Sequence, residues 1–185
     1  MSIIYKRNTE KLNILLKQER SLFHLKDLRL LWNINNPATL RRTVSRYVKK
    51  GALIPIYRGF YSVLPIGKID PLDLGASAFH VFCYVSTETV LVQAGIIFQE
   101  IYAYTYCSSQ TKTIQIGENT YKSRQLKDKC LYNPAGIIDQ PNYKIASTER
   151  AVADMLYFSP KYYFDSHNLI DWKKVKTIQK EVGYI

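Results

Sequence analysis

The chain of 185 residues contains only three cysteines, and their wide spacing excludes several kinds of site. Cys83, Cys107 and Cys130 form no CxxC pair, and no histidine lies near them at the spacing of metal ligands. A scattered, odd number of cysteines is typical of reduced thiols in a cytoplasmic protein and not of a disulfide framework or a zinc site. We therefore expect all three thiols to be buried and free.

Long apolar runs are also missing. No stretch approaches the roughly 18 apolar residues that a membrane-spanning helix needs, and residues 1–7 lack the apolar core of a signal peptide. The sequence therefore predicts a soluble, cytoplasmic protein that does not enter a membrane. Its 46% of hydrophobic residues would allow one large or two small packed domains.

Catalytic motifs are scarce as well. His24, His80 and His167 are far apart in the sequence, and the acidic residues are scattered. The chain has no glycine-rich phosphate loop, no carboxylate pair followed by lysine as in nucleases, and no Gly-Ser with a downstream Asp-x-Asp as in nucleotidyltransferases. We expect a binding protein and not an enzyme, with no catalytic residue, no metal and no cofactor.

Acidic residues are rare in the first third of the chain. Residues 1–65 contain thirteen Lys and Arg against three acids, a balance of +10 out of the total net charge of +11. The remaining 120 residues contain thirteen basic and twelve acidic side chains. A positive field confined to one segment is typical of a nucleic-acid-binding module joined to an electrically neutral domain.

The centre of this basic segment is a helix predicted between Asn36 and Gly51. Asn36 suits the N-cap, Pro37 suits the first helical position, and Gly51 suits the left-handed turn after the helix. With about 100° per residue, one side of this helix is apolar and the other is basic. The apolar side consists of Leu40, Val44, Tyr47 and Val48.

The basic side of this helix is the predicted DNA-binding surface. Five Lys and Arg without an acid lie between residues 41 and 50, whereas a solvated surface helix usually mixes its charges. A merely solvated basic face is the alternative interpretation. The side chains expected to face bases are Thr39, Arg42, Ser45 and Arg46, and those expected to hold phosphates are Arg41, Lys49 and Lys50.

Two further residues complete the predicted DNA-binding set. Asn36 begins the basic helix, and Arg58 lies beside Gly59 at the tip of a predicted hairpin. Arg58 would enter a minor groove, touch the DNA backbone, or only be solvated.

The order of elements predicts an α+β protein of two domains. Helices expected over residues 9–19 and 25–32 precede the basic helix, and strands expected over 53–56 and 60–63 follow it, which is the order of a winged helix-turn-helix. The composition changes over residues 64–73, which contain two prolines and a glycine. We therefore expect a winged helix-turn-helix domain over residues 1–66 and a mixed α/β domain with an antiparallel sheet over residues 67–185.

In the second domain the sequence predicts four helices and four strands. Helices are expected over 72–79, from Ser86 as N-cap to Gly95, from Ser147 as N-cap to 158, and within 169–185. Strands are expected over 81–85, 101–106, 111–116 and 121–126, and a loop over 133–142.

Three segments in this order resemble the AbiEi antitoxins of type IV toxin–antitoxin systems, which act in abortive phage infection. The segments are Tyr57 to Tyr61 (YRGFY), Tyr84 to Ile96 (YVSTETVLVQAGI) and Ile145 to Tyr157 (IASTERAVADMLY). The resemblance implies that the N-terminal domain binds inverted repeats in its own promoter as a monomer or homodimer and represses the operon. It also implies that the C-terminal domain counteracts a nucleotidyltransferase-like toxin without forming a stable complex with it.

The residues that would carry the antitoxin activity are not assigned by this resemblance. Glu149 and Arg150 are candidates, although both also fit the first turn of a capped helix. A plain winged-helix transcription factor, whose C-terminal domain dimerises or senses a ligand, is the alternative function, and a DNA-cutting nuclease is a further one. The gene next to this one would distinguish the antitoxin from the transcription factor.

Overall fold

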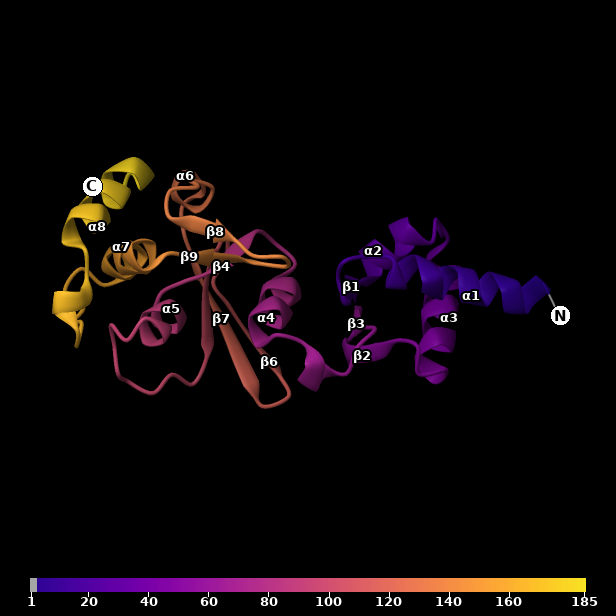
Figure 1. The fold of residues 1–185 in the computed structure, drawn as a ribbon. Coiled ribbons are helices and arrows are strands. Elements are labelled where there is room, and N and C mark those ends of the chain that lie inside the picture. The colour runs from indigo at the N-terminus through magenta and orange to yellow at the C-terminus, as the bar shows by residue number, and fades with distance from the viewer. Residues whose placement is uncertain (1–2) are drawn as a thin grey trace. The chain divides into compact units, whose positions relative to one another are not determined.

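The computed structural model describes residues 3–185, with side chains from residue 10 onward (Figure 1). The chain divides into two compact units that meet at Asp70 and Pro71, whereas the predicted boundary follows residue 66. The α+β class is confirmed, because 42% of the residues are helical and 20% are in strands. Across residues 3–185, no helix combines the length and apolarity required to cross a membrane.

The first unit contains three helices and a three-stranded antiparallel sheet. Its elements are α1 (Ile3–Leu16), β1 (Leu22–His24), α2 (Leu25–Leu31), α3 (Pro37–Lys49), β2 (Ile54–Tyr57) and β3 (Phe60–Ser62). A 3₁₀ turn at Ile66–Lys68 leads out of this unit. The strands follow the order β1-β3-β2, so the hairpin of β2 and β3 carries β1 on its other side.

The sequence did not predict β1. The segment Ser21 to His24 reads as a break between two helices because three residues are too few to show an alternating pattern. Its partner is β3, with Phe23 opposite Tyr61, and this pairing between distant segments gives no local signal. Pro55 lies in β2, an edge strand, next to a bulge between Pro55 and Tyr57, and edge strands and bulges are where sheets tolerate proline.

The core of the first unit joins all three helices to the hairpin. Its fully buried members are Leu15, Phe23, Leu28, Trp32, Leu40, Val44, Tyr47 and Leu53. The Trp32 and Tyr47 rings lie 5.1 Å apart, and the indole N–H of Trp32 donates to the carbonyl oxygen of Lys11 at 3.1 Å. These contacts hold α1 and α3 against the same indole, so the exposed side of α3 has a fixed orientation within this unit.

The second unit is built on a six-stranded sheet. Its strands are β4 (Cys83–Val85), β5 (Tyr104–Ser108), β6 (Lys112–Ile116), β7 (Asn119–Gln125), β8 (Ile137–Asp139) and β9 (Lys144–Ala146). Its helices are α4 (Pro71–Phe79), α5 (Glu88–Gln93), α6 (Asp128–Leu131), α7 (Thr148–Phe158) and α8 (Trp172–Val182), with a 3₁₀ turn at His167–Leu169.

This sheet is mixed, although the sequence predicts an antiparallel one. The strand order is β6-β7-β5-β4-β9-β8. Three pairs are antiparallel as expected, but β4 pairs with β9 and β5 pairs with β7 in parallel. The β5–β7 pair is possible because β6 lies between them in the chain and carries it back along the sheet.

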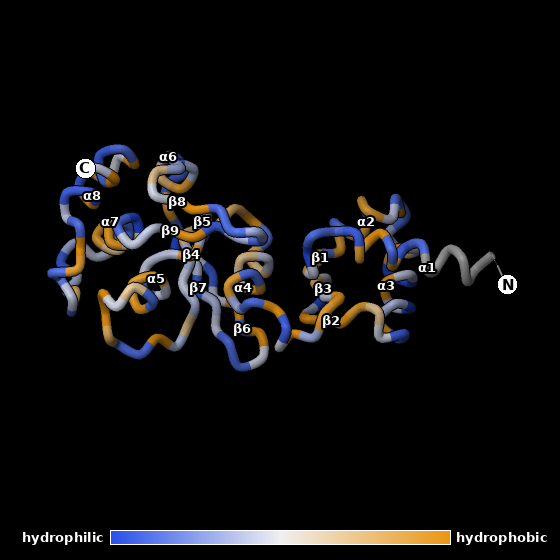
Figure 2. Tube along the Cα trace, in the orientation of Figure 1, coloured by the Kyte–Doolittle hydropathy of each residue, from blue (hydrophilic) through white to orange (hydrophobic). Residues whose placement is uncertain are grey.

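Helices cover both faces of the sheet (Figure 1). On one face lies α4, whose mostly apolar residues are visible in Figure 2, and the Tyr106 hydroxyl donates to the carbonyl oxygen of Leu72 at its start. On the other face lie α5 and α7, with α8 packed outside α7. Gly75 permits the close approach of α4, because a Cβ there would lie 2.3 Å from the Tyr106 hydroxyl oxygen and 2.3 Å from Cδ1 of Tyr121.

The predicted helices over 72–79 and 169–185 and the strand over 111–116 are present as α4, α8 and β6, but other local predictions in this unit differ. Ser86 does not cap α5; the N-cap residue is Thr87, and the Ser86 hydroxyl donates to Asp154. The predicted loop over 133–142 contains the strand β8, which pairs with β9. Ser147 caps α7 as predicted, since its hydroxyl oxygen accepts the N–H of Arg150 at 3.2 Å.

Candidate functional site

Both ends of α3 are formed as the sequence predicts. The side-chain oxygen of Asn36 accepts the N–H of Thr39 at 3.0 Å, and Pro37 occupies the first turn. Gly51 has a φ of 69°, the left-handed conformation expected directly after the helix. Asn36 therefore uses its acceptor oxygen for the cap, which leaves its NH₂ group as the donor for any contact outside the helix.

Every residue of the predicted DNA-binding set is exposed. This holds for Asn36, Thr39, Arg41, Arg42, Ser45, Arg46, Lys49, Lys50 and Arg58. None of the six cations in this set forms an ion pair with any side chain from residue 10 onward. The positive charge of α3 and of the hairpin is therefore not neutralised by acids of this part of the chain.

Arg41 and Arg58 line the same groove. The groove lies between α3 and the β2–β3 hairpin, has a volume of about 580 Å³, and includes Ser45 on its helix side. Arg58 lines the groove from the turn between β2 and β3, in which Gly59 has a φ of 89°. The N–H of Leu25, the first residue of α2, donates to the carbonyl oxygen of Gly59 at 2.8 Å. This hydrogen bond fixes the hairpin tip against the start of α2.

The exposed side of α3 thus has two parts. Arg41 and Ser45 face the groove, whereas Arg42 and Arg46 do not line it. With about 100° per residue, the two pairs point roughly 100° apart around the helix. The sequence grouped Ser45 with Arg42 and Arg46, but the groove places Ser45 beside Arg41.

Two of the three histidines lie against aromatic rings. His24 stacks on Phe60 with ring centroids 4.3 Å apart, and the His167 ring lies 4.5 Å from the ring of Trp172. Over residues 10–185 no group of three His, Cys, Asp or Glu side chains is arranged to hold a metal ion. Cys83, Cys107 and Cys130 are buried and free, as the sequence predicts.

A buried cluster of charged and polar side chains lies beneath α7 in the second unit. Arg150 is fully buried and donates to Asp154 Oδ1 at 2.9 Å, to the Tyr84 hydroxyl at 2.9 Å and to three carbonyl oxygens. The carbonyls belong to Asn133, Ala135 and Cys130, at 3.2, 2.8 and 2.8 Å. These contacts use all five N–H donors of the guanidinium.

Asp154 accepts the remaining hydrogen bonds of this cluster. Its Oδ2 accepts the hydroxyls of Tyr84 at 3.0 Å and Ser86 at 2.7 Å, and its Oδ1 accepts the Tyr184 hydroxyl. Burial raises the pKa of both Tyr84 and Tyr184 well above the usual tyrosine value, so both hydroxyls keep the proton that they donate. The cluster ties α7 to β4, to the segment before β8 and to the C-terminal end.

The two residues considered for antitoxin activity therefore have different surroundings. Arg150 is inaccessible to any partner, because its side chain is 0% exposed and its donors are all used. Glu149 is partly exposed and lies 3.9 Å from the Lys174 ammonium group. The cluster could not be found from the sequence, because the partners of Arg150 and Asp154 outside α7 lie 15 to 70 residues away from them along the chain.

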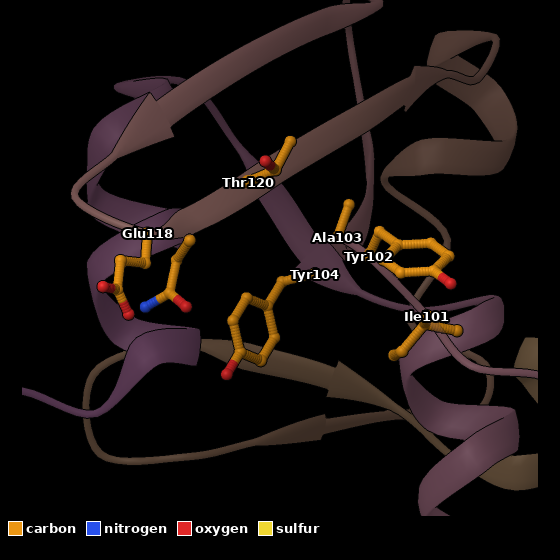
Figure 3. Close-up of a pocket in the computed structure, with 7 residues that line it drawn as sticks. Ile101, Tyr102, Ala103, Tyr104, Glu118 and Thr120 are labelled. Carbon is orange, nitrogen blue, oxygen red and sulfur yellow. The ribbon is translucent and has the colours of Figure 1, made fainter.

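A hollow of about 380 Å³ lies where β5 and β7 begin (Figure 3). Tyr104, whose ring stacks on Tyr121 at 5.5 Å, points into it, and Glu118 lies at the opposite wall. Its lining contains one carboxylate and no cation, thiol or imidazole.

Comparison with known proteins adds no assignment: no protein-family model matches the chain, and no curated protein matches it significantly.

Proposed function

We propose that the first unit is a winged helix-turn-helix that binds duplex DNA, with α3 as the recognition helix and the β2–β3 hairpin as the wing. The observation that carries the proposal is the set of six exposed cations on α3 and the hairpin tip that have no acidic partner among residues 10–185. The phosphate backbone of duplex DNA is a partner that neutralises such a surface.

In this proposal the two parts of the exposed side of α3 have different roles. Arg42 and Arg46, which do not line the groove beside the hairpin, meet base edges in the DNA major groove, where a guanidinium binds guanine through two hydrogen bonds. Lys49 and Lys50 lie at the last turn and the C-cap of the helix and hold phosphates. Arg41 and Arg58 flank the groove on its helix and hairpin sides.

We further propose that the protein is an antitoxin that represses its own operon and counteracts a nucleotidyltransferase-like toxin through the second unit. This part rests on the resemblance of residues 57–61, 84–96 and 145–157 to AbiEi antitoxins. Tyr84, Ser86, Arg150 and Asp154 all belong to these segments and form the buried cluster. These four residues therefore maintain the core, and other residues of this unit form the surface that opposes the toxin.

The DNA-binding proposal is tested by measuring affinity for the DNA upstream of the gene and for random duplex DNA. Arg42→Ala and Arg46→Ala should each lose about 1–3 kcal/mol on the upstream DNA and much less on random DNA. Lys49→Ala, the matched control, should weaken both by the same factor. Equal losses on both DNAs for Arg42 and Arg46 would show that this side of α3 does not face bases.

The antitoxin proposal is tested by separating the two activities. A variant with Arg41, Arg42 and Arg46 all changed to Ala should lose repression of a promoter reporter but still protect cells when the adjacent toxin gene is induced. Protection should persist because these side chains are exposed in the first unit and contribute nothing to its core. A folded variant that loses both activities would place them on one surface, and a neighbouring gene without toxicity would favour the plain transcription factor.

A further inference from the structure

The groove between α3 and the hairpin brings together two cations that the sequence assigns to separate contacts. Arg41 and Arg58 both line it, both are exposed, and neither has an acidic partner from residue 10 onward. Two positive charges beside one hollow favour an anion between them. Guanidinium groups present N–H donors in a planar fork that matches the oxygens of a phosphate.

Part of the groove's lining is apolar. Val44 and Val48 of α3 and Pro55 of the hairpin contribute C–H surface, and Tyr61 adds an aromatic ring. This surface suits the C–H groups of a deoxyribose or the methyl group of thymine. A DNA strand carries a phosphate and an apolar sugar side by side, and the volume of about 580 Å³ leaves room for both.

We propose that one DNA strand crosses this groove and that Arg41 and Arg58 hold the same backbone phosphate, with the adjoining sugar against Val44 and Val48. This inference rests on the proposed DNA-binding function and adds a specific contact to it. Helix and hairpin then bind one nucleotide in common, which fixes the position of the base-contacting residues Arg42 and Arg46 along the duplex. Ser45, on the same side of α3, donates its hydroxyl to that phosphate or the next one.

The test is a scan of the bound DNA with neutral methylphosphonate linkages, one position at a time. Replacing the shared phosphate removes both contacts and should lower the affinity of the unaltered protein about a hundredfold. On DNA with that linkage, Arg41→Ala and Arg58→Ala should each have no further effect, whereas on every other duplex each should lower affinity about tenfold. Lys49→Ala, the control, should lower the affinity for DNA with that linkage as it does for unmodified DNA, and should lose its effect only on DNA with a methylphosphonate at a different position.

The outcomes separate this inference from the function on which it rests. The shared contact is refuted if Arg41→Ala and Arg58→Ala lose their effect at two different methylphosphonate positions, or if Arg58→Ala keeps its effect at every position. DNA binding itself would stand in both cases. If the unaltered protein does not bind duplex DNA, the proposed function fails and the inference fails with it. The same scan is repeated with Arg41→Gln and Arg58→Gln, which remove the charge but keep a polar side chain, and it should give the same result. Thermal unfolding of each variant verifies that it is folded.

Discussion

Removal of the Arg150 side chain should strongly destabilise the second unit. In Arg150→Met the carboxylate of Asp154, which is also 0% exposed, loses its only cationic partner in the cluster. The carbonyl oxygens of Cys130 and Ala135 lose donors at 2.8 Å in the same change. Breaking a buried ion pair costs about 3–5 kcal/mol, and each buried acceptor left unpaired adds about 1 kcal/mol or more. We therefore expect a loss of about 5–7 kcal/mol.

A double-mutant cycle separates the ion pair from the rest of the cluster. Asp154→Asn keeps the size of the side chain but leaves the Arg150 guanidinium buried without a counterion, so it should also cost about 3–5 kcal/mol. The double variant should be more stable than the sum of the two losses predicts, by roughly 1–3 kcal/mol, because removing both charges avoids leaving one of them buried alone.

The assay is urea unfolding followed by tryptophan fluorescence. Trp32 lies in the core of the first unit, and Trp172 lies in the second unit at the start of α8. Trp32→Phe therefore leaves a reporter for the second unit alone, and Trp172→Phe leaves one for the first unit. Arg150→Met should move the Trp172 transition and leave the Trp32 transition in place. A loss below about 1 kcal/mol, or strict additivity in the cycle, would refute the reasoning.

Three further outcomes follow from single contacts. Gly75→Ala should lower the free energy of unfolding by about 2 kcal/mol or more, in spite of alanine's higher helix propensity, because the added Cβ would lie 2.3 Å from atoms of Tyr106 and Tyr121. In the control Gly67→Ala the added Cβ meets nothing within 4 Å, so the free energy of unfolding should change by less than about 0.5 kcal/mol. Asn36→Asp should keep the cap of α3 and its stability but weaken DNA binding through its negative charge, and Asn36→Ala should cost about 1 kcal/mol of stability; unchanged DNA affinity in Asn36→Asp would place this end of α3 away from phosphates. Burial raises the pKa of the Cys83 thiol to about 12 from its ordinary value of 9.0. As the pH rises, the unfolded chain therefore loses this proton before the folded chain does, and the free energy of unfolding should fall between pH 9 and 12 by up to about 1.4 kcal/mol per pH unit. Urea unfolding at several pH values should show a weaker pH dependence in Cys83→Ala, and the same pH dependence as in the unaltered protein would contradict this assignment.

Elements with local signals were predicted well from the sequence. The ends of α3 follow from Asn36, Pro37 and Gly51, whose preferences concern only their own backbone and its nearest neighbours. The cap at Ser147 and the helix after it were found for the same reason.

Elements that depend on distant partners were not predicted. The strand β1 exists because β3 pairs with it, and the parallel pairing of β5 with β7 depends on the path of β6 between them. Ser86 carries a residue type that suits an N-cap, but its hydroxyl donates to Asp154, 68 residues away, and the cap falls at Thr87.

The exposure of the candidate residues was predicted from the sequence, but their arrangement was not. The helical period alone places Arg42, Arg46 and Lys49 on the exposed side of α3, where they lie. The period could not show that Arg58 of the hairpin lines a groove with Arg41 and Ser45, because that depends on how the hairpin packs on the helix. The pattern within α3 was therefore enough to predict its basic exposed side, whereas the groove depends on packing between the helix and the hairpin and could not be predicted.

The salt dependence of affinity for duplex DNA tests the central claim most directly. If α3 and the hairpin neutralise roughly five phosphates, the logarithm of the affinity should fall with the logarithm of salt concentration at a slope near −4 to −5. Lys49→Ala with Lys50→Ala should reduce the magnitude of this slope by about 2. Lys176→Ala with Lys180→Ala, which removes the same charge from exposed positions of α8, should leave it unchanged. A slope near zero, or equal effects of the two double variants, would contradict the account.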